Sequence, residues 1–102
     1  MHAYALTKDA EADLEGIAHY TIIEWGEVQA SLYIDKLHQC FQKLATKNIR
    51  SKTFSQQFPH VFVTSCEHHC VFSLHHEKEK PLIIAVLHER MDMLARLKTR
   101  LQ

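Results

Sequence analysis

The feature that most constrains this chain is an uninterrupted apolar run near its end, residues 82–87. A strand with one face in water alternates apolar and polar residues, whereas a strand without any polar position needs cover on both faces. The run is also far shorter than the ~20 residues of a membrane-spanning helix. We therefore expect residues 82–87 to form a central strand covered on both sides, in a chain that has no membrane role.

The first half of the chain predicts two amphipathic helices joined by a short connection. Thr7 is a suitable N-cap for the first helix, and Gly26 ends it because glycine tolerates the backbone conformation that closes a helix. So short a connection makes the two helices antiparallel neighbours. The inward positions, spaced three or four apart, are Ala10, Leu14, Ile17, Thr21 and Trp25 in the first helix and Ala30, Tyr33, Leu37, Phe41 and Leu44 in the second.

β-Branched and aromatic residues mark the strands of the second half. The predicted strands are residues 3–6, 60–65, 70–74 and 82–87, with a loop over 48–59 and a polar turn over 77–81. Leu94, Leu97 and Leu101 predict a short terminal helix. The order β-α-α-β-β-β-α indicates an α+β fold, in which the helical hairpin packs on a mostly antiparallel four-stranded sheet. At 102 residues the chain is expected to form a single domain, 1–102.

The formal net charge is zero, which argues against independent nucleic-acid binding driven by phosphate neutralisation. The charges are nevertheless unevenly distributed. Residues 1–35 hold one lysine and seven acids, residues 36–52 hold five bases and no acid, and the terminal helix is basic. Such segments either engage differently charged partners or form solvated helix faces, and the sequence leaves both interpretations open.

Cysteine and histidine gather in the segment Cys66-Glu67-His68-His69-Cys70. A zinc site from Cys66, Cys70 and one of the two histidines requires the chain to turn at residues 67–69, and no second cysteine pair completes it. The alternative is a histidine-rich hairpin tip with two small apolar cysteines, so we expect no metal. Three cysteines in total, Cys40 included, and the absence of a leader segment favour reduced thiols in the cytoplasm.

The segment His88-Glu89-Arg90-Met91-Asp92 follows the apolar run directly. As an active site, His88, Glu89 and Arg90 would act as base, orienting group and phosphate ligand. As a junction between strand and helix, the segment would place Asp92 at the helix N-terminus and Met91 inward. We favour the junction. With only two glycines the chain has no phosphate-cradling loop, and we expect no cofactor.

The chain resembles the ParE branch of the RelE/ParE toxin superfamily along nearly its whole length. The residues that carry the resemblance are Tyr4, Ala5, Leu6, Thr7, Ala10, Ala12, Asp13, Leu14, Ile17, Tyr20, Thr21, Trp25, Gly26, Gln29, Ala30, Tyr33, Leu37, Leu44 and Ala45, and then Leu87, His88, Glu89, Arg90, Met91, Asp92 and Leu97. One departure lies in the third strand, where Ser73 and Leu74 stand in place of the family's tyrosine and arginine.

The resemblance implies a cytoplasmic toxin of a bacterial type II toxin-antitoxin system, of the kind that stabilises plasmids. Members of this branch inhibit DNA gyrase, with the A subunit as the suspected contact, and are not enzymes. A small cognate antitoxin neutralises them, and here we expect it to cover apolar surface of the sheet and the helical hairpin. Alternatives are a ribosome-dependent mRNA endonuclease of the RelE branch, or a degenerate, non-toxic member that binds only DNA or its antitoxin.

The resemblance also assigns residues. Trp25, Gly26 and the segment from His88 to Asp92 are expected to be structural family signatures. Independently of the resemblance, the position of these charges beside an otherwise neutral fold makes the basic terminal helix our expected target-binding element, through Arg96, Lys98, Arg100 and Leu101.

Overall fold

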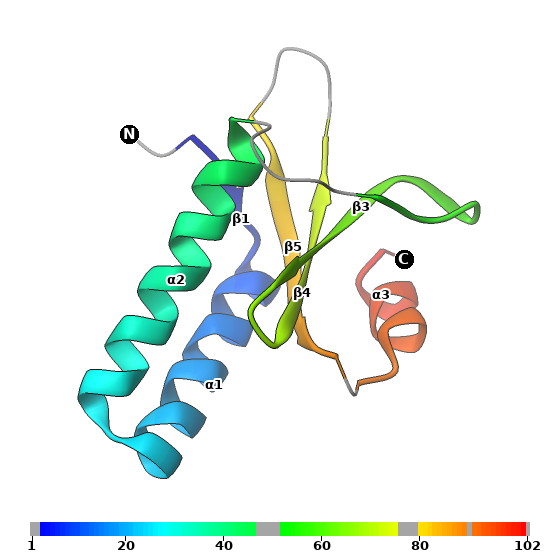
Figure 1. The fold of residues 1–102 in the computed structure, drawn as a ribbon. Coiled ribbons are helices and arrows are strands. Elements are labelled where there is room, and N and C mark those ends of the chain that lie inside the picture. Colours follow the sequence, from blue (N-terminus) through cyan, green and yellow to red (C-terminus); the bar gives the residue numbers. More distant parts are fainter. Residues whose placement is uncertain (1–2, 47–51, 76–79, 90, 102) are drawn as a thin grey trace.

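The computed structural model describes residues 3–46, 52–75, 80–89 and 91–101. Within these ranges the chain folds into one sheet with helices on both faces (Figure 1). The elements are β1 (Ala5–Leu6), α1 (Lys8–Trp25), α2 (Glu27–Ala45), β2 (Lys52–Ser55), β3 (Phe58–Cys66), β4 (His69–Leu74), β5 (Leu82–His88) and α3 (Met93–Leu101). The strand order is β1-β5-β4-β3-β2, with β1 parallel to β5 and all other neighbours antiparallel.

The predicted α+β class and the helical hairpin are confirmed, but the sheet has five strands rather than four. The additional strand, β2, lies in the segment predicted to be a loop, of which residues 48–51 fall outside the described residues. β2 is an edge strand that pairs only with β3, so half of its backbone groups face away from the sheet. Phe54 anchors it by an edge contact with Phe72 of β4, with ring centroids 5.1 Å apart.

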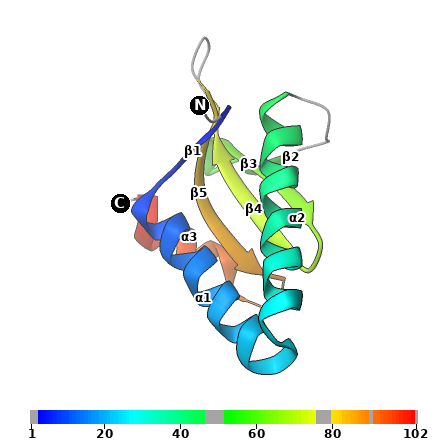
Figure 2. The same cartoon turned by 90° about the vertical axis from the view of Figure 1, so that its left-hand side faces the viewer.

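Two apolar clusters lie on opposite faces of the sheet, as the unbroken apolar run predicted. The hairpin cluster joins Leu14 of α1 and Leu37 and Phe41 of α2 to Val71 and Ile83 of the sheet. The α3 cluster joins Leu97 to Val61, Phe72, Ile84 and Leu87 on the other face. Figure 2 views the molecule from the hairpin side, with α1 and α2 in front of the strands. β5 is thus covered on both faces.

Two residues identified in the sequence, Thr7 and Gly26, define where the helices of the hairpin begin and end. The Thr7 side chain accepts a hydrogen bond from the Ala10 amide at 3.1 Å and so caps α1. Gly26 ends α1 and begins α2, with its amide bonded to the Ile22 carbonyl and its carbonyl bonded to the Ala30 amide. Its φ of 92° and ψ of 166° lie in a region that residues with a Cβ atom rarely adopt.

Gly26→Ala is therefore expected to lower the free energy of unfolding by about 1–3 kcal/mol, the usual cost of forcing such a backbone conformation. An added Cβ meets no atom within 4 Å there, so the loss arises from the backbone alone. Gly16→Ala is the matched control, because this helical glycine also has open space around its Cβ position. It should stabilise the chain by up to about 1 kcal/mol. Urea unfolding of both variants checks the difference, and equal effects would contradict the assignment.

The three cysteines correct the expectation of reduced thiols. Cys40 of α2 and Cys66 of β3 form a disulfide, and Cys70 is free. Cys66 belongs to the hairpin cluster, whereas Cys70 packs against the α3 cluster on the other face. A zinc ion shared by Cys66 and Cys70 does not fit this arrangement. No group of three or more His, Cys, Asp or Glu side chains in the described ranges is placed to hold a metal ion.

None of the helices that the structure describes is long and apolar enough to cross a membrane.

Candidate partner-binding site

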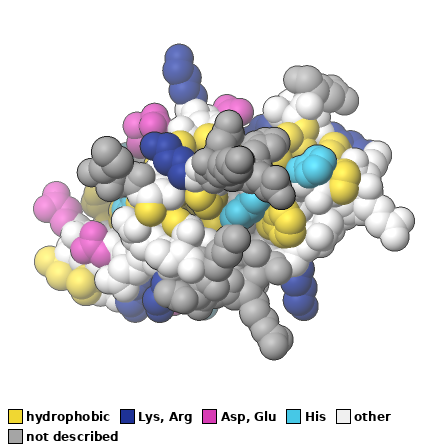
Figure 3. All heavy atoms as spheres, turned by 90° about the horizontal axis from the view of Figure 1, so that it is seen from above, with side chains coloured by type: hydrophobic (Ala, Val, Ile, Leu, Met, Phe, Trp, Pro, Cys, Tyr) yellow, Lys and Arg dark blue, Asp and Glu magenta, His cyan; other side chains and the backbone are white. Residues whose placement is uncertain are grey.

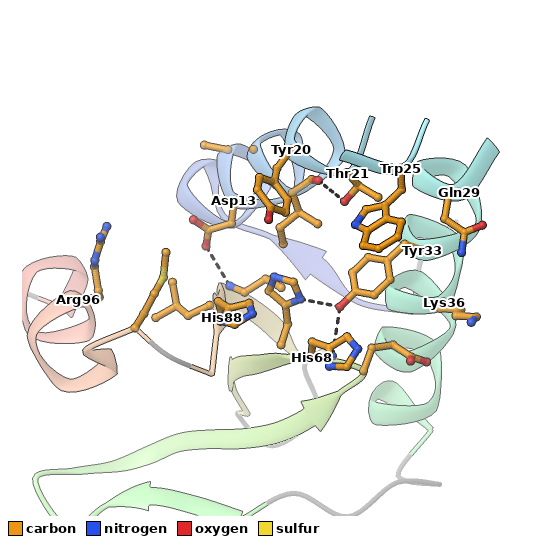
Figure 4. A pocket seen from close by; sticks show the side chains of 18 residues that line it. Asp13, Tyr20, Thr21, Trp25, Gln29, Tyr33, Lys36, His68, His88 and Arg96 are labelled. Carbon is orange, nitrogen blue, oxygen red and sulfur yellow. Dashed lines mark hydrogen bonds between the residues drawn. The ribbon is translucent and has the colours of Figure 1, made fainter. Parts of the chain in front are cut away.

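A cavity of about 800 Å³ lies between the helical hairpin and the ends of β4 and β5. In Figure 4, Tyr20, Trp25 and Tyr33 extend from the hairpin toward His68 and His88 on the sheet side, with Arg96 and Lys36 at opposite ends. Its volume falls in the range of ordinary ligand pockets. The lining residues are Ala12, Asp13, Gly16, Ile17, Tyr20, Thr21, Trp25, Gln29, Tyr33, Lys36, Glu67, His68, His69, Val86, Leu87, His88, Met91 and Arg96.

Tyr33 ties the hairpin to the turn between β3 and β4. Its hydroxyl is 2.7 Å from Nδ1 of His69 and accepts a hydrogen bond from the His68 amide at 3.2 Å. Burial raises the pKa of Tyr33, and the negative charges of Glu67 and Glu89 add to the rise, while the His68 amide acts in the opposite direction. The phenol is therefore neutral near pH 7, and its oxygen holds these two hydrogen bonds on the cavity wall.

His69 and His88 meet edge to face across β4 and β5, with ring centroids 5.4 Å apart. Burial lowers the pKa of His69, and the neighbouring rings of His88 and His68 lower it further, against a smaller opposite effect of Glu89 and Asp13. The neutral imidazole is thus favoured at this position. His88 lines the cavity, whereas Glu89 lies exposed in the following turn.

The lowered pKa of His69 predicts that the folded chain loses stability in acid. Because the pKa of His69 is lowered below its ordinary value of 6.5, the folded chain binds fewer protons there than the unfolded chain does as the pH falls through that value. The contribution is complete above the unfolded pKa and declines as the pH falls toward the folded one. We expect the free energy of unfolding to fall between about pH 8 and pH 5, and His69→Gln to flatten that fall.

Urea unfolding across this pH range is the measurement. His19→Gln is the control, since His19 is exposed on α1 and should leave the profile unchanged. A His69→Gln profile as steep as that of the natural chain would exclude His69 as the source.

Asp13 and Arg100 form a bidentate ion pair on the inner side of α1, with N–O distances of 2.7 and 2.8 Å. Asp13 also accepts a hydrogen bond from the Val86 amide, and Arg100 donates one to the Ile84 carbonyl. β1 pairs with only Leu82 and Ile83, so these two side chains satisfy the β5 backbone beyond the point where β1 ends. The hydrogen bond to Asp13 raises the pKa of Arg100, which stays charged.

This pair changes the interpretation of the terminal helix. Arg96 and Lys98 are exposed, as a target-binding face requires. Arg100, however, is bound to Asp13, and Leu101 packs against the α3 cluster. Of the four predicted target-binding residues, the structure therefore presents two on the surface and uses two within the fold.

The family-signature residues have distinct structural roles. Gly26 connects the helices, and Asp92 caps α3 by accepting a hydrogen bond from the Ala95 amide at 3.2 Å. Arg90 lies outside the described residues. Met91 was expected to pack inward, but its side chain is 41% exposed at the cavity mouth, because the turn after His88 carries it past the end of the sheet.

Trp25 was expected on the buried face of the first helix, but it is 72% exposed. The hairpin extends beyond the strands of the sheet at the end where α1 meets α2 (Figure 1). Other large apolar side chains in the last turns of α1 and the first turns of α2 are exposed as well. We call this group the tip surface, made of Tyr20, Ile22, Ile23, Trp25, Val28 and Leu32.

On the face seen in Figure 3, lysine and arginine side chains are scattered rather than collected into one patch. The cavity rim carries both signs, with Lys36 and Arg96 against Glu67. The apolar tip surface, next to an aromatic cavity, is therefore the more distinctive surface for recognising a partner.

The two residues that replace the family's tyrosine and arginine are integrated into the core. Ser73 is fully buried, with its hydroxyl 2.9 Å from Nε2 of His75, and Leu74 packs against the α3 cluster. Neither side chain is available for a polar contact outside the chain.

Comparison with known proteins agrees with this architecture. The family described as the ParE toxin of the type II toxin-antitoxin system parDE matches residues 4–93. A Toxin ParE from Escherichia coli is 48% identical over 102 residues, covering 100% of this chain and 99% of the relative. A chain of the chromosomal ParDE toxin-antitoxin system from P. aeruginosa has the same fold, with a TM-score of 0.71 at 20% identity over 86% of this chain and 96% of that one. The chain belongs to the ParE toxin family of type II toxin-antitoxin systems.

Proposed function

We propose that this chain is a cytoplasmic toxin that inhibits DNA gyrase and is neutralised by a cognate antitoxin that binds the tip surface and the adjoining cavity. The observation that carries the antitoxin part is the exposure of large apolar side chains at the hairpin tip, Trp25 at 72% and Val28 at 77%. Such a surface costs free energy in water, and a partner that covers it recovers that cost. The groove between hairpin and sheet suits an amphipathic helix with apolar anchors.

We propose that the toxin acts by binding rather than by catalysis. Two polar groups of the cavity are engaged within the chain, since Asp13 is paired with Arg100 and the Tyr33 hydroxyl is hydrogen-bonded to His69. A catalytic base must instead reach a substrate proton, and an oxyanion needs donors that are not already occupied. The gyrase target rests on membership of the ParE family and on the resemblance described above, and the A subunit is the expected contact.

The test is a supercoiling reaction with gyrase, relaxed plasmid and ATP, with and without the purified chain. We expect linear, gyrase-cleaved DNA to accumulate when the chain is present, and the antitoxin to suppress it. Unperturbed supercoiling at an excess of folded toxin would contradict the gyrase target. Transcript cleavage on translating ribosomes would then support the endonuclease alternative, with His88→Gln as the first variant.

The terminal helix is tested in the same reaction. Arg96→Glu combined with Lys98→Glu should reduce cleaved DNA if α3 contacts gyrase, because both side chains are exposed. Arg100 is left unchanged, since its ion pair with Asp13 is part of the fold. Lys43→Glu, an exposed charge reversal on α2, is the control. Equal activity of the double variant and the control would remove α3 from the target surface.

A further inference from the structure

The Cys40–Cys66 disulfide connects α2, which lines the cavity, to the last residue of β3, directly before the turn that lines it. The two Cα atoms are 6.2 Å apart and the residues are 26 positions apart in the sequence. Cys66 directly precedes the two-residue turn Glu67–His68. The next residue, His69, is hydrogen-bonded to the Tyr33 hydroxyl. Cys40 follows Tyr33 by two turns on α2. The disulfide and the Tyr33 hydroxyl are therefore two separate ties between α2 and the same strand turn.

The disulfide adjoins a depression, and its two cysteines are 8% and 4% exposed. This depression, of about 310 Å³, is lined by Lys36, Lys43, Ser65 and Glu67 together with the two cysteines. Lys36 also lines the main cavity, so the two hollows share a wall. Two lysines and one carboxylate thus line the depression that the disulfide adjoins. Positive charge near a cysteine stabilises the thiolates that form and attack during thiol–disulfide exchange.

The third cysteine does not compete in this chemistry. Cys70 packs on the opposite face of the sheet from Cys66. Burial raises the pKa of its thiol, with a further contribution from Glu89, so it is a poor nucleophile near pH 7. Only one intramolecular pairing is therefore accessible in the folded chain, and its opening and closing can be reversible.

We infer that Cys40 and Cys66 are a reversible redox pair that sets how firmly α2 holds the β3–β4 turn, and with it one wall of the cavity. A dithiol reductant transfers two electrons and two protons to the sulfur pair. The Cys40–Cys66 bond breaks, two thiols form, and the reductant closes its own disulfide. Among the residues that the structure describes, the Tyr33 hydroxyl is then the remaining side-chain tie between α2 and the turn. The consequence for antitoxin binding rests on the proposed function, whereas the change in the wall does not.

The first test uses the chain alone, with dithiothreitol as the dithiol probe. After purification without reductant, we expect one reactive thiol after unfolding in denaturant, and three after dithiothreitol treatment. Hydrogen exchange at residues 66–69 should become about tenfold faster on reduction, because opening of the turn is then resisted by one tie instead of two. Oxidised glutathione should restore the slow exchange.

Two matched variants sharpen this test. Cys70→Ser keeps the pair and should respond to dithiothreitol as the natural chain does. Cys40→Ser should exchange quickly in both conditions. If all three thiols remain free after treatment with oxidised glutathione, or if exchange at the turn is unchanged by reduction, the inference is overturned.

The second test measures antitoxin affinity for the oxidised and reduced chains. We expect reduction to weaken binding about fivefold, because the wall must then be ordered when the partner binds. No binding to either form would contradict the proposed antitoxin site, while the exchange experiment would still decide the redox pair. Equal affinity of both forms, together with redox-dependent exchange, would overturn the link between the pair and the antitoxin site.

Discussion

Trp25→Ala is expected to weaken antitoxin binding by about 2–4 kcal/mol, a factor of roughly 30 to 1,000 in the dissociation constant. Tryptophan contributes more than most residues to interfaces when a partner removes it fully from water, since it buries a large rigid surface with little loss of conformational entropy. Trp25 is 72% exposed in the free chain and lies on both the tip surface and the cavity wall. Isothermal titration calorimetry with the antitoxin is the measurement.

The same exposure makes the experiment easy to interpret. Few contacts within the chain are lost with the indole ring, so the thermal midpoint of the free toxin should change little. Gln42→Ala is the matched control, because Gln42 is exposed on α2 and does not line the cavity. If Trp25→Ala and Gln42→Ala bind the antitoxin equally well, the tip surface is not its binding site. A second expected consequence is that the free toxin associates or adsorbs at concentrations where the complex stays monodisperse.

The helical hairpin was predictable from the sequence because its information is local. A period of three to four, Thr7 as a cap and Gly26 as the connection act over a few residues, and each is found in the structure. β5 was predictable for a similar reason, since a strand without polar positions has to be covered on both faces. In contrast, β2 is defined by its pairing with β3 alone, and its sequence Lys-Thr-Phe-Ser has no alternation that distinguishes it from a loop.

The candidate site could not be predicted in the same way, because it is formed by contacts between residues far apart in the sequence. Periodicity identified Tyr33 as an inward residue of α2, but its hydrogen bond to His69 spans 36 residues and follows from how the hairpin lies on the sheet. The partner of Cys40 was hidden in the same way, because an odd number of cysteines points away from pairing. Trp25 has the same helical spacing as the inward residues of α1, but the sheet ends before it. The length of the sheet is a tertiary property that the spacing does not report.

Asp13 and Arg100 show how a sequence can suggest the wrong role for a charge. Arg100 was expected to bind the target because it belongs to a basic helix, but it follows Leu97 by three positions and so shares the inward side of α3. Asp13 follows Ala10 by the same spacing on α1. Each residue is at the border of a buried face, and the two borders meet at β5. Their side chains are only 15% and 17% exposed.

Asp13→Ala is therefore expected to lower the free energy of unfolding by about 2–4 kcal/mol. The substitution leaves the Arg100 guanidinium and the Val86 amide without their partner in a largely buried setting, and breaking one side of such a pair costs more than the pair itself contributes. Arg100→Lys should also destabilise, because lysine lacks the planar fork whose two nitrogens bond both carboxylate oxygens while one of them also reaches the Ile84 carbonyl. Urea unfolding monitored by circular dichroism gives these values.

A double-mutant cycle separates the pair from its surroundings. Either single variant leaves the other charge without its partner. The double variant Asp13→Ala with Arg100→Ala should therefore lower the free energy of unfolding by about 1–3 kcal/mol less than the sum of the two single variants. Glu15→Ala, at an exposed acid on the same helix, should change stability by less than about 0.5 kcal/mol. Additive losses would show that the two residues stabilise α1 and α3 independently. A positive coupling would mean that loss of activity after substitution of Arg100 reports unfolding, so that only Arg96 and Lys98 can report contact with gyrase.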